Sequence, residues 1–180
     1  MIQRIQTLWL ALAALSMALC FVTPAAKYTY FDANLNQTTR AQLELLPKEN
    51  PAMLDQIAAR ESVVDFSQKA SHFPTWPLIV EALVVIVFAV VSIFLFKNRV
   101  RQGNFVMVGF LVNLSYIFLL FFWAVDDYAY AVKSYMHLRD LSVTWALGAY
   151  LPIASLAFLF LASRAIRKDE EKVRAADRLR

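Results

Sequence analysis

The chain has 180 residues, of which 59% are apolar and 18% charged, whereas soluble domains are roughly 45–50% apolar, so an ordinary soluble protein is excluded. A net charge of +4 suggests nucleic-acid binding in soluble proteins, but here the basic residues flank apolar segments and no nucleic-acid partner is predicted. The single cysteine, Cys20, excludes an intrachain disulfide and dithiol redox chemistry.

Four segments have about the 20 mainly apolar residues that a helix needs to cross a hydrocarbon core of about 30 Å. They are residues 5–22, 76–96, 105–125 and 143–163. The sequence therefore predicts an all-α membrane protein, one domain of residues 1–180 in which an antiparallel bundle of four helices spans the membrane. The first segment also fits a signal peptide, but Pro24 spoils the cleavage pattern, so we interpret it as an uncleaved span.

The first loop, residues 23–75, is predicted to form a small extracytoplasmic subdomain. Lys27–Asp32 alternates in the manner of a strand, which indicates a strand or a strand pair. Residues 38–46 have a helical composition, and Met53–Lys69 predicts an imperfect amphipathic helix. That helix either covers the outer face of the membrane or the bundle, or binds a partner.

The distribution of basic residues predicts the orientation. Seven of the 18 basic residues lie from Arg164 onward, three lie in the short connection 97–104, and Arg4 precedes the first span. The positive-inside rule therefore places both termini in the cytoplasm, where anionic lipid head groups are the expected partners. Three of the four tryptophans fall at the opposite ends of the spans, as an aromatic belt would: Trp76, Trp123 and Trp145.

Polar residues within the spans are the candidate intramembrane sites. Glu81 has two readings, a proton- or cation-binding group, or a hydrated or arginine-paired group near the surface. The second is favoured because Glu81 lies only about 7.5 Å of helical rise from Trp76. Asn113 in the third span is expected to hydrogen-bond to a neighbouring helix. Pro152 is expected to kink the fourth span.

The connection between the third and fourth spans is rich in polar residues. Together with His72, its side chains suggest a metal site, but no pair has a recognised ligand spacing: Asp126, Asp127, His137, Arg139 and Asp140. The spans hold no histidine that would ligate haem. We therefore predict no metal, no cofactor and no catalytic residues.

The tail, residues 164–180, is predicted to continue the fourth helix into the cytoplasm, with pairs such as Asp169–Lys172 along it. It is read either as a solvated helix lying on anionic lipid or as a docking helix. Its candidate interaction residues are Arg167, Lys168, Arg174, Arg178 and Arg180.

Several stretches resemble a family of four-span membrane proteins of Bacteroidota that is known as a domain of unknown function. They are Met1–Thr7, Lys97–Arg99 with Gln102, Gly148–Pro152, Leu161–Glu170 and Asp177–Arg180. The resemblance covers the whole chain and is weakest in the first loop. It implies a location in the bacterial inner membrane and an uncleaved N-terminus, and it brings no catalytic residues.

Two functions fit the sequence. The first is a non-catalytic accessory or assembly protein that meets a membrane-protein partner through its outer loop or its tail. The second is a subunit of a small transporter or channel, which rests on Glu81, Asn113 and Pro152. A four-span chain has little room for a pathway, so this second function requires a homo-oligomer.

Overall fold

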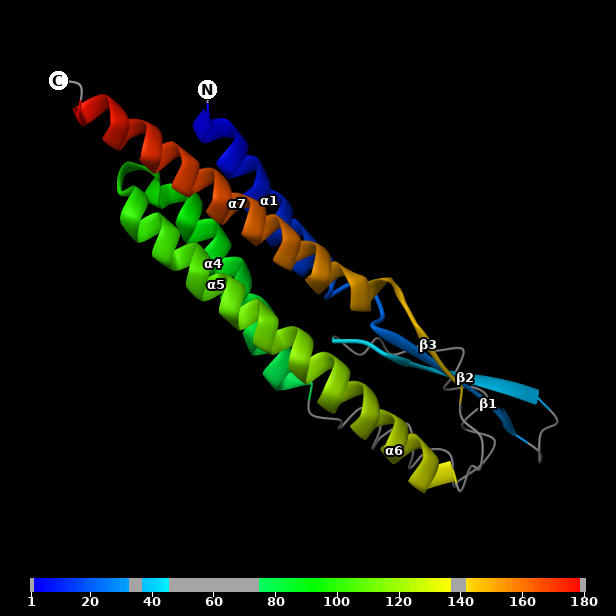
Figure 1. Cartoon of the computed structure of the whole chain (residues 1–180). Coiled ribbons are helices and arrows are strands. Elements are labelled where there is room, and N and C mark those ends of the chain that lie inside the picture. Colours follow the sequence, from blue (N-terminus) through cyan, green and yellow to red (C-terminus); the bar gives the residue numbers. More distant parts are fainter. Residues whose placement is uncertain (1, 33–36, 46–74, 137–141, 179–180) are drawn as a thin grey trace.

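The computed structural model describes residues 2–32, 37–45, 75–136 and 142–178. They form an elongated helical bundle with a small β-sheet at one end (Figure 1). Both ends of the chain lie at the other end of the bundle. We call the end that holds Ile2 and Arg178 the termini end, and the opposite end the sheet end.

Among the described residues, three helices are long and apolar enough to cross a membrane, and a fourth apolar helix is shorter. They are Trp76–Phe94, Arg99–Tyr130 and Leu147–Val173, with Ile5–Leu19 as the shorter one. Their length and composition are those expected of a multi-pass membrane protein. The first helix, α1 (Ile2–Leu19), ends before the predicted Val22, because the amides of Cys20 and Phe21 bond three residues back in a tighter turn.

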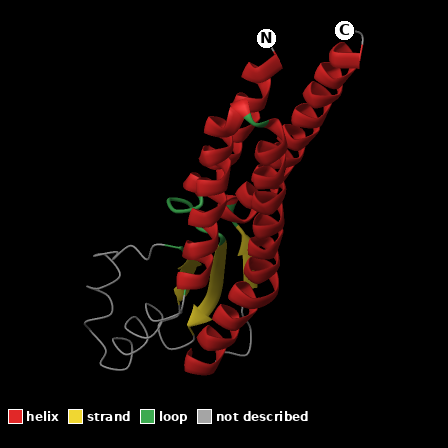
Figure 2. Cartoon of the chain, turned by 90° about the vertical axis from the view of Figure 1, so that its left-hand side faces the viewer, coloured by secondary structure: helices red, strands yellow, loops and turns green. Residues whose placement is uncertain are grey.

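The four main helices pack in a ring. α1 packs mainly against α4 (Trp76–Phe94) and α7 (Leu147–Arg178). α5 (Arg99–Leu119) packs mainly against the same two helices, and not against α1. Figure 2 shows the helices side by side, with the strands beside their lower part, away from the N and C labels. The outer surface carries large apolar side chains such as Phe94, which is 73% exposed. The centre holds small residues that let helices approach closely, among them Ala13, Ala82, Ala89 and Ala162.

The third predicted span does not stop at Val125. α5 passes through a π-helical turn, Leu120–Ala124, into α6 (Val125–Met136). Asp126 and Asp127 end the apolar run, but both side chains are exposed and do not break the helix. The third helix therefore carries on past the predicted end of its span, alongside the sheet.

The sheet has three antiparallel strands in the order β2-β1-β3. β1 (Ala26–Asp32) and β2 (Gln37–Leu43) form a hairpin, and β3 (Ser142–Trp145) pairs with the other edge of β1. Ala26 consequently faces Leu43 on one side and Trp145 on the other. The strand predicted from Lys27–Asp32 is confirmed as β1, and its partner β2 lies mostly in residues that were expected to be helical.

Two predictions at the sheet end were wrong. Within residues 38–46, expected to be helical, residues 38–43 belong to β2, where the β-branched Thr38 and Thr39 pair with β1. Residues 143–145, expected to begin the fourth span, belong to β3, so α7 begins at Leu147. The all-α class is thus corrected to a mostly helical protein with a small sheet. The predicted helix Met53–Lys69 lies outside the described residues.

Candidate functional site

A largely buried ion pair joins the start of α5 to α7 at the termini end. The Nη1 atom of Arg99 lies 3.2 Å from Oδ2 of Asp169 and also donates to the Asp169 carbonyl oxygen at 3.2 Å. Asp169 is only 8% exposed. Asn98 caps α5, its Oδ1 atom accepting from the Arg101 amide at 3.2 Å. Asp169 thus pairs with Arg99 of the neighbouring helix α5, and not with Lys172 as the sequence predicted.

Two buried glutamines connect further helix pairs at the same end. Gln102 Nε2 donates to the Ser92 carbonyl oxygen at 3.0 Å, which ties α5 to α4. Gln6 Nε2 donates to the Ala165 carbonyl oxygen at 3.3 Å, which ties α1 to α7. With the Arg99–Asp169 pair, these bonds form a set that we call the termini latch. It holds α7 to the bundle beyond the predicted end of its span.

The predicted tail falls into two parts. Up to Asp169 it packs against the bundle, as the 2% exposure of Ile166 also shows. After Glu170 the helix continues to Arg178 with exposed side chains at residues 171–173 and 175. The helical tail is therefore confirmed. Of its candidate interaction residues, Arg167 and Lys168 are exposed, Arg174 and Arg178 are in α7 with side chains outside the described set, and Arg180 lies outside the described residues.

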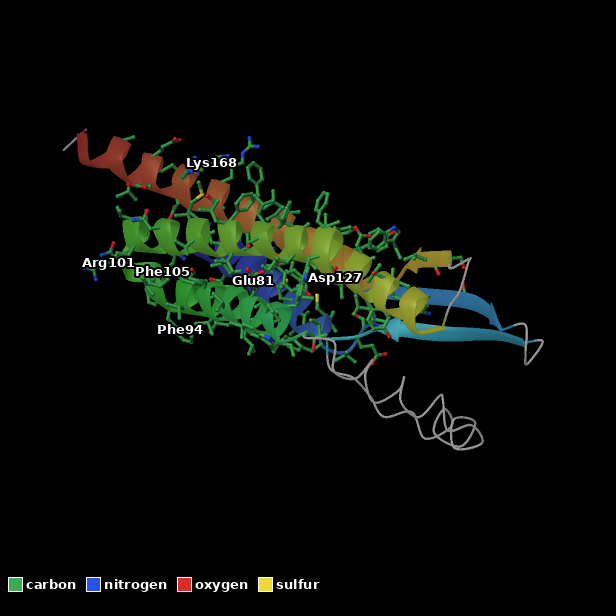
Figure 3. All side chains as sticks on the ribbon, turned by 90° about the horizontal axis from the view of Figure 1, so that it is seen from below. Glu81, Phe94, Arg101, Phe105, Asp127 and Lys168 are labelled. Atoms are coloured by element: carbon green, nitrogen blue, oxygen red, sulfur yellow. The ribbon has the colours of Figure 1, made fainter. Side chains whose placement is uncertain are left out.

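Glu81 lies on α4 near the sheet end, one to two turns from the exposed Trp76. Ser115 Oγ of α5 donates to its Oε1 atom at 3.0 Å. Its Oε2 atom is buried and has no hydrogen-bond partner in the described part of the chain. Figure 3 shows Glu81 between the ends of the bundle, with Asp127 nearer the sheet and Arg101 and Lys168 toward the termini end. Among the described residues, Glu81 is hydrogen-bonded to Ser115, whereas the sequence suggested an arginine as its partner.

Asn113 links α5 to α7 at the proline turn. Its Nδ2 atom donates to the Pro152 carbonyl oxygen at 3.2 Å, as the expected bond to a neighbouring helix requires. Its Oδ1 atom is buried without a hydrogen-bond partner among the described residues. Asn113 is 0% exposed, so this amide stays in the interior with one half unsatisfied.

At the sheet end, Tyr28 of β1 fixes the sheet to the third helix. Its hydroxyl donates to the Val125 carbonyl oxygen at 3.0 Å, and its ring lies 4.9 Å from that of Tyr128 between centroids. Burial raises the pKa of Tyr28, and Tyr128 and Asp126 raise it further. A second aromatic contact, between Phe121 and Trp145 at 4.7 Å, ties β3 to the π-helical turn.

The start of α7 is bonded directly to the backbone that follows α1. The Gly148 amide donates to the Pro24 carbonyl oxygen at 2.9 Å, and the Ala146 amide to that of Ala25 at 3.0 Å. A Cβ atom on Gly148 would lie 2.6 Å from the Pro24 oxygen and 2.8 Å from that of Thr23. Only glycine allows this approach, so the Gly148–Pro152 motif has a packing role.

A family model described as domain of unknown function (DUF4293) matches residues 2–179. The chain belongs to the DUF4293 family. No curated protein and no solved structure matches it. The resemblance of the DUF4293 chain to a family with a domain of unknown function is thereby confirmed over nearly its whole length, and its apolar helices are long enough to span a membrane.

Three of the stretches that pointed to the DUF4293 family, Met1–Thr7, Lys97–Arg99 with Gln102, and Leu161–Glu170, contribute residues to the termini end. Gln6, Asn98, Arg99 and Gln102 all belong to the termini latch or its helix cap. Sequence reasoning missed that they act together with Asp169. The available signal was an acidic residue placed directly after a basic run. No group of three metal-ligating side chains occurs among the described residues, and His72, His137, Arg139 and Asp140 fall outside them.

Proposed function

We propose that this DUF4293 chain is an integral protein of the bacterial inner membrane that acts as a non-catalytic accessory or assembly partner. Its two termini lie in the cytoplasm and its sheet lies outside. This orientation is supported by the basic residues at the termini end, including Arg99, Arg101 and Arg164, and by Trp76 and Trp145 at the sheet end.

The observation that carries the proposal is the extension of α7 beyond the bundle. α7 has 32 residues, about 48 Å of helix, whereas the hydrocarbon core is about 30 Å thick. The termini latch fixes the direction of this helix through Asp169. A basic anchor needs only exposed charge, but a docking helix needs a defined direction. The projecting part after Glu170 is therefore the proposed contact with a cytoplasmic or membrane-protein partner.

The third helix gives a second platform on the other side. From Arg99 to Met136 it extends about 57 Å, and Tyr28 holds the sheet against it. The outer sheet and α6 are the surface through which the outer part of the chain would meet a partner.

The test is affinity purification of the full chain from native membranes in mild detergent. A variant that lacks residues 171–180 keeps Asp169 and should keep the fold, but should lose a partner that the full chain recovers reproducibly. The double variant Arg174→Gln, Arg178→Gln should reduce recovery, while Arg164→Gln, at an exposed position before the latch, should not. Identical recovery with and without residues 171–180 would contradict a docking tail.

A second function, as a subunit of an oligomeric transporter or channel, is favoured by two unsatisfied atoms, Oε2 of Glu81 and Oδ1 of Asn113. Buried polar atoms without partners are rare and frequently functional. Under this function, Glu81→Gln should change a transport or growth phenotype without unfolding the protein. An unchanged phenotype would count against transport and leave the accessory role intact.

A further inference from the structure

We propose that the chain binds one anionic phospholipid in a groove between α5 and α7 at the termini end. The groove has a volume of about 330 Å³ and is open to the surface of the bundle. The inference rests on the proposed membrane location, but not on the proposed partner.

The lining of the groove changes from charged to uncharged along the helix axes, and its uncharged part holds the polar Asn104 beside apolar side chains. Arg99, Arg167 and Glu170 line it at the termini end, and Met107 and Ser163 line it further toward the sheet end. The apolar segments of the two helices begin at residue 105 and end at residue 163, so the groove crosses the predicted boundary between head groups and hydrocarbon. A phospholipid has this same order of a charged head and an apolar chain.

Gly103 keeps the middle of the groove open. A Cβ atom at this position would meet nothing closer than Cγ2 of Ile166 at 3.9 Å. By contrast, a Cβ atom on Gly109 would lie 3.2 Å from Phe88, and one on Gly148 would meet backbone at 2.6 Å. Close helix packing therefore explains the other two glycines but not Gly103, which lines an unfilled space.

The charges at the mouth favour an anion. Arg167 is exposed, and Arg99 is already oriented by its bonds to Asp169. The N-terminus of α5 adds partial positive charge. Glu170 is the acidic group in the lining, and it has an interaction partner of its own. The Arg99–Asp169 pair is neutral as a whole, so the exposed guanidinium of Arg167 is the group that can bind a lipid phosphate. The exposed Arg101 and Lys168, on the same turns of α5 and α7, add the positive charge that favours an anionic head group over a zwitterionic one.

The experiment uses the purified full-length chain in nanodiscs that contain phosphatidylglycerol and phosphatidylcholine, with retained lipid counted by native mass spectrometry. The wild type should keep one phosphatidylglycerol in preference to phosphatidylcholine. Arg167→Gln should weaken this binding about fivefold, the factor expected for one basic group at a membrane surface. Gly103→Leu should abolish it by filling the groove.

The matched controls are Arg164→Gln, an exposed arginine one turn away, and Ala157→Leu, an exposed enlargement elsewhere on α7. Both should retain phosphatidylglycerol as the wild type does. Equal retention by Gly103→Leu and the wild type, or no preference for the anionic lipid, would overturn the proposal. So would a groove occupied by a second copy, seen as a dimer that Gly103→Leu dissociates without changing lipid retention. The nanodiscs contain no other protein, so none of these outcomes bears on the proposed accessory role.

Discussion

Arg99 and Asp169 are 70 residues apart in the sequence, yet Nη1 of Arg99 binds both the carboxylate and the carbonyl oxygen of Asp169 at 3.2 Å. The side chains are 28% and 11% exposed, so water competes only partly for them. The pair connects the turn after α4 to the last packed turn of α7. The direction of the projecting helix consequently depends on a contact inside the bundle.

We expect Asp169→Asn to lower the free energy of unfolding by about 1–3 kcal/mol, because it leaves Arg99 without its counter-charge. The measurement is denaturant or thermal unfolding in detergent, and a double-mutant cycle with Arg99→Gln should show strong coupling. Glu171→Gln, an exposed acid two residues on, should change stability little. A loss as large in Glu171→Gln as in Asp169→Asn would show that charge in general, and not the pair, stabilises this end.

Gly148→Ala should destabilise the protein by about 1–3 kcal/mol or more, since the new methyl group meets backbone atoms that cannot rotate away. Gly103→Ala has room for the same methyl group, at 3.9 Å from the nearest side chain. It should stabilise the helix by about 0.5–1 kcal/mol. Unfolding temperatures of the two variants, measured in one detergent, check this opposite response. If both shift in the same direction, the close approach at Pro24 is not the cause.

Tyr28→Phe should cost about 1–2 kcal/mol, because the Val125 carbonyl oxygen loses its donor. It should also change the alkaline limit of stability. Burial raises the pKa of Tyr28 above the value of about 10 that it has when unfolded. The unfolded chain therefore loses this proton first, and wild-type stability falls as pH rises above about 10. Tyr28→Phe should flatten that decline, while Tyr130→Phe, at a residue that is 74% exposed, should leave it unchanged.

Asn113→Leu should change stability by less than about 1 kcal/mol. The variant loses one interhelical bond, worth about 0.6 kcal/mol on average, but it also removes an unsatisfied buried oxygen. Ser155→Ala is the control, because the Ser155 hydroxyl donates to the Ala13 carbonyl oxygen at 3.1 Å and leaves no such atom unsatisfied. Unfolding of both variants should rank Asn113→Leu as the more stable, and the reverse order would show that the Asn113 amide is fully satisfied.

The long apolar helices could be predicted because length and apolar composition are local properties, as in Trp76–Phe94. Their boundaries on the sheet side could not. Ser142–Trp145 is apolar enough to extend a span, but its conformation is decided by pairing with β1, more than 100 residues earlier. Asp126 is polar enough to end a span, yet it is compatible with a continuing helix.

The candidate site was predictable only one residue at a time. Glu81 and Asn113 stand out by polarity, and the basic residues stand out by position, but their partners do not. Asp169 stands out after a basic run, but nothing local identifies Arg99 as its partner, or Ser115 as the partner of Glu81. Such contacts depend on how the helices are rotated about their axes, which packing of the whole ring decides.

The middle position of β1 in the sheet has a consequence for how the chain is made. β3 is synthesised after α4 and α5. At a synthesis rate of roughly 5–20 residues per second, roughly 5–20 s pass between the synthesis of β1 and that of β3, its second partner strand. During that interval one edge of β1 is open to other chains. In the proposed topology, the sheet closes only when both intervening helices have crossed the membrane. A chain that failed one crossing would then leave β1 and β3 on opposite sides, so the complete sheet would form only in correctly inserted chains.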